Sequence, residues 1–237
     1  LWFIDSEKTN PSVEDALEFS KTNSPGKALS VLETEIEKRG LKKVYEEIEL
    51  PIVPIIKKAE DRGILIDKKY FEKLSAEYHK SLSAIEKKIW KHAGVEFNIN
   101  SPKQLGEILF DKMALVGEKG VRMKKTEGGA RSTRISELEK LKDSHPIIKE
   151  IIDHRELSKL LSTYIDAIPP LLDSENRLHT TFIQTGASTG RMASQNPNLQ
   201  NIPLHSDLGK AIRHAFVVDS GFELLALDYS QIELRLA

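Results

Sequence analysis

The sequence predicts an α+β protein in which a mainly helical region is followed by short strands. Between residues 67 and 94, apolar residues recur every three or four positions, which is the pattern of an amphipathic helix with one buried face. After Pro170 the pattern changes. Residues 178–183 are rich in Thr, Phe and Ile, which favours a strand, and residues 222–227 form an apolar run too short for a helix. Helices are therefore expected first and the beginning of a sheet second.

Helix start and stop signals divide the helical region. Asp67 is a suitable N-cap and Gly94 a suitable stop for the long helix, whose buried stripe we expect to include Phe71, Leu74 and Ile89. Further helices are expected after three local signals, namely Ser101-Pro102, Ser132-Thr133 and the stretch that runs from Pro146 to just before Pro169-Pro170.

The first 40 residues contain two weaker signals. Leu1 to Ile4 form an apolar run that is compatible with a short buried strand. A helix is expected from Lys27 to Gly40, with Leu29, Leu32 and Ile36 on its buried face.

Composition limits the classes of function. The 237 residues include 35 Lys plus Arg and 36 Asp plus Glu, so the net charge of -1 does not indicate a nucleic-acid partner and such evidence must be local. The absence of cysteine excludes disulfides and thiolate metal sites. Because no apolar run approaches the length of a bilayer and no signal peptide opens the chain, we expect no membrane partner and a cytoplasmic location.

The junction at residues 228–233 is a candidate metal site. Asp228 follows the expected strand at 222–227 and precedes an expected helix that starts near Gln231. A carboxylate at the end of a buried strand faces a cleft, and one or two carboxylates there can hold Mg²⁺ while phosphates and water complete its coordination. The alternative is that Asp228 or Ser230 only caps the following helix, and spacing alone leaves both interpretations open.

The loop at residues 185–203 is a candidate nucleic-acid contact. It combines Arg191 with amide side chains, rigid prolines and flexible glycines. Arginine and amides can hydrogen-bond the minor-groove acceptors that all base pairs present in similar positions, which suits a protein that checks pair geometry without reading sequence. A polar surface loop would have a similar composition, so this alternative also stays open.

Basic residues form two further candidate contacts. Residues 119–134 hold six cations and one acid around Gly128-Gly129, which suits a phosphate backbone. Arg155 and Lys159 are four residues apart and share a face of one expected helix. Each group could equally be an ordinary solvated surface.

The order of these motifs resembles a known family. Residues 228–235, Asp-Tyr-Ser-Gln-Ile-Glu-Leu-Arg, match the first palm motif of the bacterial DNA polymerase I family, the family A DNA polymerases. Thr189-Gly190-Arg191, followed by the run Asn-Leu-Gln-Asn-Ile-Pro at 198–203, matches the segment before that motif. Earlier segments, in the same order, resemble the entry to the polymerase region, the thumb and the helix that leads into the palm: 48–51, 101–105, 124–126 and 155–164. The resemblance covers residues 28–237.

This resemblance implies an incomplete family A polymerase fold. Residues 1–44 would be the C-terminal remnant of an upstream 3'-5' exonuclease-like domain with its linker, and residues 45–165 a mainly helical thumb. Residues 166–237 would be the start of an antiparallel-sheet palm, truncated after its first motif. The fingers and the second metal-binding motif of the family are not in this sequence, so we expect the fragment alone to be inactive.

The resemblance also implies roles for single residues. Asp228 would hold catalytic Mg²⁺, of which the complete enzyme would use two ions, with Tyr229 adding backbone contacts nearby, and Glu233 would exclude a ribose 2'-hydroxyl. The deoxynucleotide would lie against Tyr229, Ser230, Gln231, Ile232 and Glu233. Primer–template DNA would contact Arg191, Gln200, Asn201, Arg155, Lys159, Lys124, Lys125, Thr126 and His205, although the family usually has Arg at the last of these positions.

The expected activity is template-directed DNA synthesis by a monomer in the cytoplasm of a bacterium, or of a phage's host. Its partners would be primer–template DNA and deoxynucleoside triphosphates. A non-catalytic, helical nucleic-acid-binding module is the main alternative, because it would explain the basic groups but not the Asp228 junction. A single-subunit RNA polymerase is a related alternative, and Glu233 argues against it because such enzymes must accept the 2'-hydroxyl.

Overall fold

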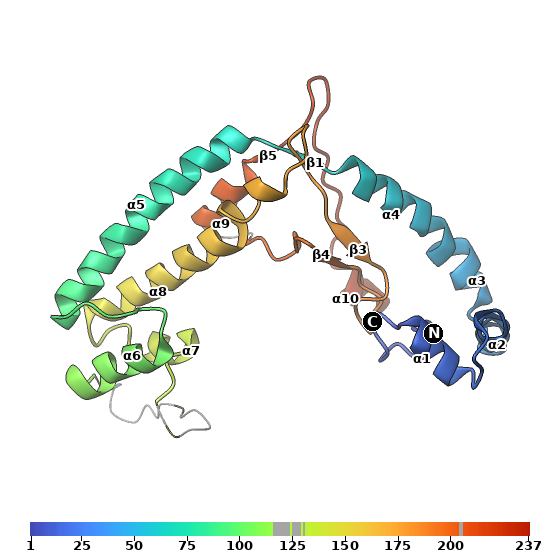
Figure 1. The fold of residues 1–237 in the computed structure, drawn as a ribbon, viewed down its shortest axis with the longest axis horizontal. Helices are drawn as coiled ribbons and strands as arrows, with labels where there is room; N and C mark the ends of the chain where they lie inside the picture. The colour runs from blue at the N-terminus through green and yellow to red at the C-terminus, as the bar shows by residue number, and fades with distance from the viewer. Residues whose placement is uncertain (116–123, 125–128, 130, 204–205) are drawn as a thin grey trace. The chain divides into compact units, whose positions relative to one another are not determined.

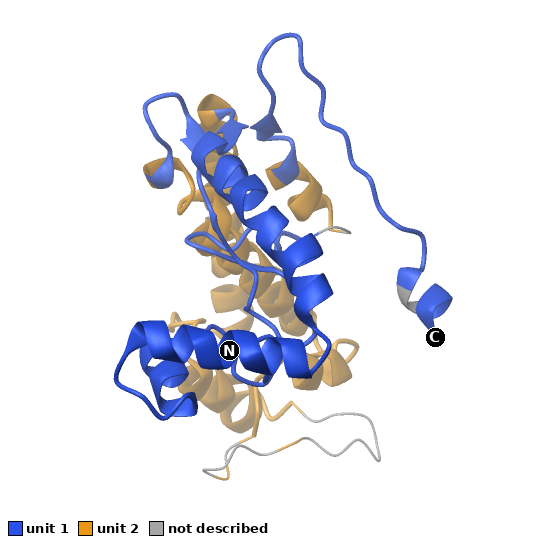
Figure 2. Cartoon of the chain, turned by 90° about the vertical axis from the view of Figure 1, so that its right-hand side faces the viewer, with its two compact units in different colours: residues 1–67, 171–204, 213–237 blue, residues 68–170, 205–212 orange. Residues whose placement is uncertain are grey.

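The computed structural model describes residues 1–237 except 116–123, 125–128, 130 and 204–205. The described residues divide into two compact units (Figure 2). The helical unit comprises residues 68–170 and 205–212, and the sheet unit comprises residues 1–67, 171–204 and 213–237. No described helix is both long enough and apolar enough to cross a membrane.

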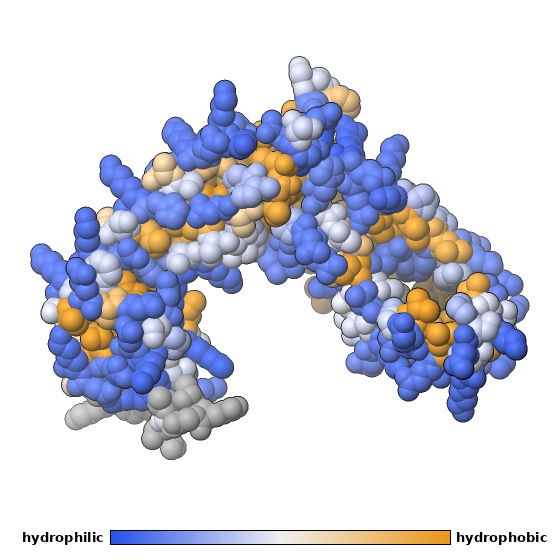
Figure 3. Space-filling view, viewed as in Figure 1, coloured by the Kyte–Doolittle hydropathy of each residue, from blue (hydrophilic) through white to orange (hydrophobic). Residues whose placement is uncertain are grey.

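Two long helices organise the helical unit. Helix α5 (Lys68–Ala93) packs along α8 (Pro146–Leu160), which continues as the π-helical segment η4 (Leu161–Ile165) (Figure 1). The expected stripe is confirmed, since Phe71 and Ile89 are fully buried in α5. Hydrophilic residues cover the outward side of this helix (Figure 3).

Shorter helices close one end of the α5–α8 pair. Ser101 caps α6 (Pro102–Gly106) by accepting a hydrogen bond from the backbone N–H of Gln104, as the Ser-Pro signal predicted. The chain continues through η2 (Glu107–Lys112), and beyond the gaps through α7 (Ile135–Leu138) and η3 (Glu139–Leu141). Residues of these elements share one apolar core with α5 and α8, formed by Ile89, Ala93, Ile99, Leu105, Leu109, Phe110, Leu138, Leu141, Ile147, Ile148 and Ile151.

The sheet unit begins with helices. Helix α1 (Val13–Phe19) packs on α2 (Pro25–Lys38), and α3 (Lys42–Val44) continues through the π-helical η1 (Tyr45–Glu49) into α4 (Leu50–Arg62). The short elements η5 (Pro169–Leu171) and α9 (Asp207–Arg213) lie where the chain passes between the two units.

The strands of this unit are short and antiparallel. Strand β1 (Ile64–Ile66) is central between β2 (Arg177–Leu178) and β5 (Phe216–Val217), with Ile64 opposite Leu178 and Leu65 opposite Val217. Strands β3 (Thr181–Ile183) and β4 (Ala193–Gln195) form a separate hairpin. The predicted α+β class, helical first and then antiparallel, is confirmed.

Two predicted strands are wrong. Residues 222–227 are not a strand, and Leu225 is 81% exposed, because no described strand lies beside this run and a strand exists only by backbone pairing. Leu1 to Ile4 form a turn, since the N–H groups of Ile4 and Asp5 both donate to the carbonyl of Leu1, although Ile4 is buried.

Two further predictions need adjustment. The expected strand at 178–183 is divided between two sheets, because Leu178 pairs with β1 whereas residues 181–183 pair with β4, and between them the Thr180 hydroxyl bonds the carbonyls of Gln195 and Pro197. In α2 the buried residues are Ala28 and Ile36, whereas Leu29 is 55% exposed because it lies 100° round the helix from Ala28.

Candidate nucleic-acid interface and metal ligand

The β3–β4 hairpin presents the loop that carries Arg191. Ile183 pairs with Ala193, so residues 184–192 form the connection between the two strands. Within this loop Gly190 has a φ of +81°, a left-handed conformation that glycine adopts without steric cost. Its N–H donates to the carbonyl of Ala187 at 3.3 Å, which closes a turn directly before Arg191. The Arg191 side chain is exposed.

The segment after β4 is held by its own side chains. Asn198 accepts the backbone N–H of Gln200 at 3.0 Å, and the Ser194 hydroxyl accepts the N–H of Leu199 at 3.1 Å. The side-chain amide of Gln200 donates to the carbonyl of Met192 at 3.0 Å, one residue from Arg191. Because an amide NH₂ group has two hydrogens, Gln200 keeps a donor for a ligand. Gln200 is close to Arg191 in the sequence, and its hydrogen bond to Met192 also holds it beside the Arg191 segment in the structure.

The junction that carries Asp228 is exposed. Helix α10 (Ile232–Leu236) follows it, as predicted, and the Arg235 guanidinium donates to the carbonyl of Ser230 at 2.9 Å. Asp228, Tyr229, Ser230 and Gln231 are all exposed, and the side chain of Glu233 lies outside the described residues.

Asp228 is the carboxylate donor of this junction that the described residues include. Among the described residues, no group of three or more His, Asp or Glu side chains could hold a metal ion. An accessible carboxylate such as that of Asp228 is the donor type that Mg²⁺ takes, so the residue fits one position of a Mg²⁺ site.

The basic segment of the helical unit is anchored at Lys124. Its backbone N–H donates to the carboxylate of Glu137 at 2.9 Å, and its carbonyl accepts the N–H of Ser132. Glu137 is buried and also accepts from Lys140 at 2.8 Å. The hydrogen bond from Lys140, and then that from Lys124, lower the pKa of Glu137. Three other predicted contacts, Lys125, Thr126 and His205, lie outside the described residues.

Arg155 and Lys159 share a face of α8 but have different environments. The Arg155 guanidinium donates to both the carbonyl and the hydroxyl of Thr133, the latter at 3.4 Å, and its half-buried position lowers its pKa by desolvation. Lys159 is exposed. Arg155 therefore has a structural contact that sequence reasoning missed, and its bonds to Thr133 use two of the five N–H donors of the guanidinium.

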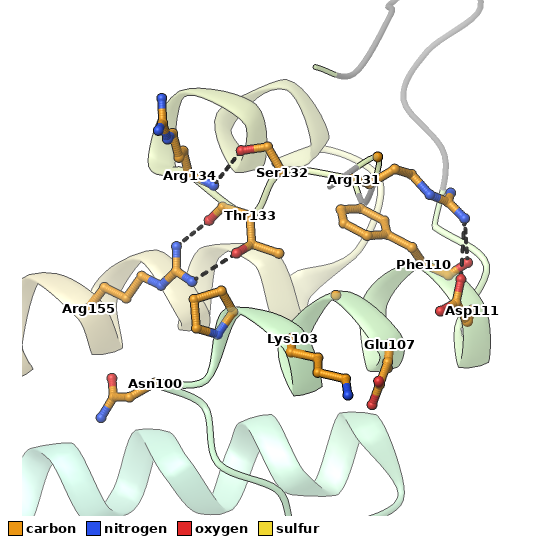
Figure 4. Close-up of a pocket in the computed structure, with 13 residues that line it drawn as sticks. Asn100, Lys103, Glu107, Phe110, Asp111, Arg131, Ser132, Thr133, Arg134 and Arg155 are labelled. Carbon is orange, nitrogen blue, oxygen red and sulfur yellow. Dashed lines mark hydrogen bonds and ion pairs between the residues drawn. The ribbon is translucent and has the colours of Figure 1, made fainter. Parts of the chain in front are cut away.

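Next to Arg155 is a groove of about 960 Å³ that lies entirely within the helical unit (Figure 4). The Arg131 guanidinium stacks 4.8 Å above the Phe110 ring and donates to the carbonyl of Phe110 at 3.2 Å. Among the described residues, the charged members of the lining are four cations and two carboxylates: Lys103, Arg131, Arg134, Arg155, Glu107 and Asp111. The sequence signal for this groove was weak, because its cations come from three separate segments.

Comparison with known proteins decides the family. The model of DNA polymerase family A matches residues 68–237, which is more than half of the chain. This chain belongs to DNA polymerase family A. The resemblance stated from the motifs is thus confirmed.

Family A relatives extend the match toward the N-terminus. The chain is 47% identical over 196 residues to DNA polymerase I of Deinococcus radiodurans, covering 82% of this chain and 20% of that protein. It is 49% identical over 197 residues to DNA polymerase I of Synechocystis sp., covering 83% of this chain and 20% of the relative. The chain thus spans about a fifth of the length of these relatives.

A solved polymerase-domain structure has the same fold. The polymerase domain of Pol1 from M. smegmatis, in complex with DNA primer–template and dNTP, superposes with a TM-score of 0.86 at 30% identity. The match covers 99% of this chain and 43% of the other.

Proposed function

We propose that this chain is part of a DNA-directed DNA polymerase, which transfers deoxynucleotides to a primer 3'-hydroxyl in DNA replication or repair. The observation that carries the proposal is the Asp228 motif at 228–235, placed at the start of α10 in a chain that belongs to DNA polymerase family A. The related polymerase domain that binds primer–template and dNTP supports the same partners here. We assign residues 45–165 to the thumb, 166–237 to the first part of the palm, and 1–44 to an exonuclease-like remnant with its linker.

In this proposal, Asp228 is one carboxylate ligand of catalytic Mg²⁺, with backbone support from Tyr229. The metal, when bound, would activate the primer hydroxyl and stabilise the leaving oxygen. Residues Tyr229, Ser230, Gln231 and Ile232 would line the nucleotide site. Glu233 would exclude the 2'-hydroxyl, a role that the Glu233→Ala variant tests by its acceptance of ribonucleotides.

The DNA contacts divide into two kinds. Arg191, Gln200 and Asn201 are exposed and would read the minor groove near the primer terminus without sequence preference. In the helical unit, Lys159 and the groove beside Arg155 would contact phosphates. Lys124, Lys125, Thr126 and His205 are proposed as further contacts on the resemblance alone.

The proposal is tested by primer extension. The full-length protein should incorporate deoxynucleotides on a primed template when Mg²⁺ is present. It should also be a monomer, and it should be found in the cytoplasmic fraction of the cell. The 237-residue chain alone should bind the DNA and incorporate nothing, since Asp228 supplies a single carboxylate for a two-metal reaction. Incorporation by the chain alone would contradict this part of the proposal.

The cationic groove of the helical unit also fits a second candidate, a nucleic-acid-binding module without catalysis. Four cations in one groove need no reaction to explain them. DNA binding by the full-length protein without any extension of the primer would favour this candidate.

A further inference from the structure

A residue near the N-terminus contacts the turn that precedes Arg191. The Trp2 indole N–H donates to the carbonyl of Ala187 at 3.1 Å, across 185 positions of the sequence. The same carbonyl accepts the N–H of Gly190 at 3.3 Å, and Arg191 is the next residue. The carbonyl of Ala187 therefore accepts from both Trp2 and Gly190, so Trp2 is bonded to the turn that positions the backbone of Arg191.

Two further bonds hold the start of this loop. The backbone N–H of Asn10 donates to the carbonyl of Thr185 at 2.9 Å. The Gln184 amide donates to the carbonyl of Glu49 at 3.2 Å and to its carboxylate at 3.1 Å. The loop is thus attached at residues 184, 185 and 187 to segments that precede the family match at 68–237.

Trp2 is itself fixed by packing. It is 8% exposed, and its ring lies 6.1 Å from that of Phe3, which in turn lies 5.9 Å from the Tyr45 ring at the start of η1. The Arg39 guanidinium donates to the carbonyl of Ile4 at 2.7 Å. Residues 1–10 are therefore anchored to the helices of the sheet unit before they reach the loop, so a shift of the loop would have to break several contacts.

From these contacts we infer that Trp2 is a positioning residue for Arg191, and that residues 1–10 brace the loop at 184–191. The inference rests on the proposed function, in which Arg191 contacts the primer-terminal base pair. A minor-groove contact is made only when the guanidinium reaches acceptors in the positions of a correct pair. Loosening the turn at Ala187 therefore slows extension of a matched end more than extension of a mismatched end, which already lacks that contact.

The test compares two tryptophans in the full-length polymerase. Trp2→Phe keeps an aromatic ring and removes the N–H bond to Ala187. Trp90→Phe is the matched control, because the Trp90 indole also donates to a backbone carbonyl, that of Phe97 at 2.9 Å, but in the helical unit. For each variant, the rate of extension is measured from a matched and from a mismatched primer end. The ratio is the matched rate divided by the mismatched rate.

We expect Trp2→Phe to lower this ratio about fivefold, the effect of one lost hydrogen bond, and Trp90→Phe to leave it unchanged. Any misfolded fraction cancels in the ratio, since both rates come from one preparation. Gln184→Met, which removes the second attachment, should lower the ratio in the same direction. An unchanged ratio in Trp2→Phe would overturn the inference.

Arg191→Ala separates the inference from the proposed function. It should lower the ratio by itself, and Trp2→Phe should add nothing further in that background, because a positioning residue acts only through the group it positions. An unchanged ratio in Arg191→Ala would overturn the role of Arg191 itself. A third outcome separates the two roles. If Arg191→Ala lowers the ratio as expected, but Trp2→Phe lowers it by the same factor whether or not Arg191 is present, the brace would be overturned and the role of Arg191 would stand.

Discussion

At the scale of single residues, His179 makes a contact in which the charge of the ring affects stability. One ring nitrogen lies 2.7 Å from the carbonyl of Glu60 and the other 2.9 Å from the carboxylate of Asp173. Only the protonated ring can donate to both acceptors. The hydrogen bond with Asp173, and then that with Glu60, raise the pKa of His179, and the same pair lowers the pKa of Asp173.

The raised pKa of His179 predicts a pH-dependent stability. A group whose pKa is higher in the folded state contributes stability fully below its unfolded pKa of about 6.5, and the contribution is lost as the pH rises through the folded value. The free energy of unfolding in urea should therefore fall as the pH is raised above about 6.5. His179→Gln should remove this part of the dependence, while the exposed control His214→Gln should keep it. An identical pH profile in His179→Gln and the parent protein would contradict the assignment.

The glycine at the end of α4 is a second residue with a clear structural demand. Gly63 has φ +61° and ψ -176°, a region that only glycine populates readily, and a Cβ there would lie 2.8 Å from the carbonyl oxygen of Leu178. Gly63→Ala should lower the free energy of unfolding by about 1–3 kcal/mol or more. Gly26→Ala should raise it by up to about 1 kcal/mol, since Gly26 lies in α2 with open space around it. Equal effects of the two substitutions, measured by urea denaturation, would contradict this account.

At the scale of elements, two cations on one face of helix α8 have separate tasks. Arg155 bonds Thr133, whereas Lys159 is exposed on the same face. Arg155→Ala should destabilise the protein by about 1.5–3 kcal/mol, because it leaves the Thr133 acceptors without their charged donor.

Lys159→Ala should instead leave thermal stability nearly unchanged and weaken DNA binding. The slope of log affinity against log salt concentration should become shallower by about the amount that one phosphate contact contributes. If Lys159→Ala were the destabilising variant, or if its salt slope equalled that of the parent protein, the division of tasks on α8 would be wrong.

Elements whose signals are local were predictable from the sequence. The Ser101-Pro102 signal and Gly94 set the ends of helices through interactions within a few residues, and the structure confirms both. The strand at 222–227 was not predictable in this way, because pairing depends on what lies beside the run and not on its composition. The division of 178–183 has the same origin, since Thr180 is held by residues 15 and 17 positions away.

At the scale of the whole molecule, the helical unit and the sheet unit each carry candidate contacts of their own, and each has its own core or sheet. The ordered motifs were sufficient to predict family A membership, since their residue types and spacing are read directly from the chain. The groove beside Arg155 and the bond from Trp2 to Ala187 were not predictable. Each brings together segments that are far apart in the sequence, and no local sequence pattern indicates such a contact.

The most direct test of the polymerase assignment is the effect of Asp228→Ala in the full-length protein. Primer extension and primer–template affinity are measured together, with Asp207→Ala, an exposed aspartate at the start of α9, as the matched control. Loss of a catalytic metal ligand removes several kcal/mol of transition-state stabilisation, so extension by Asp228→Ala should fall about a thousandfold or more while DNA affinity is retained and the control remains active. Extension at the parent rate by Asp228→Ala would contradict the account.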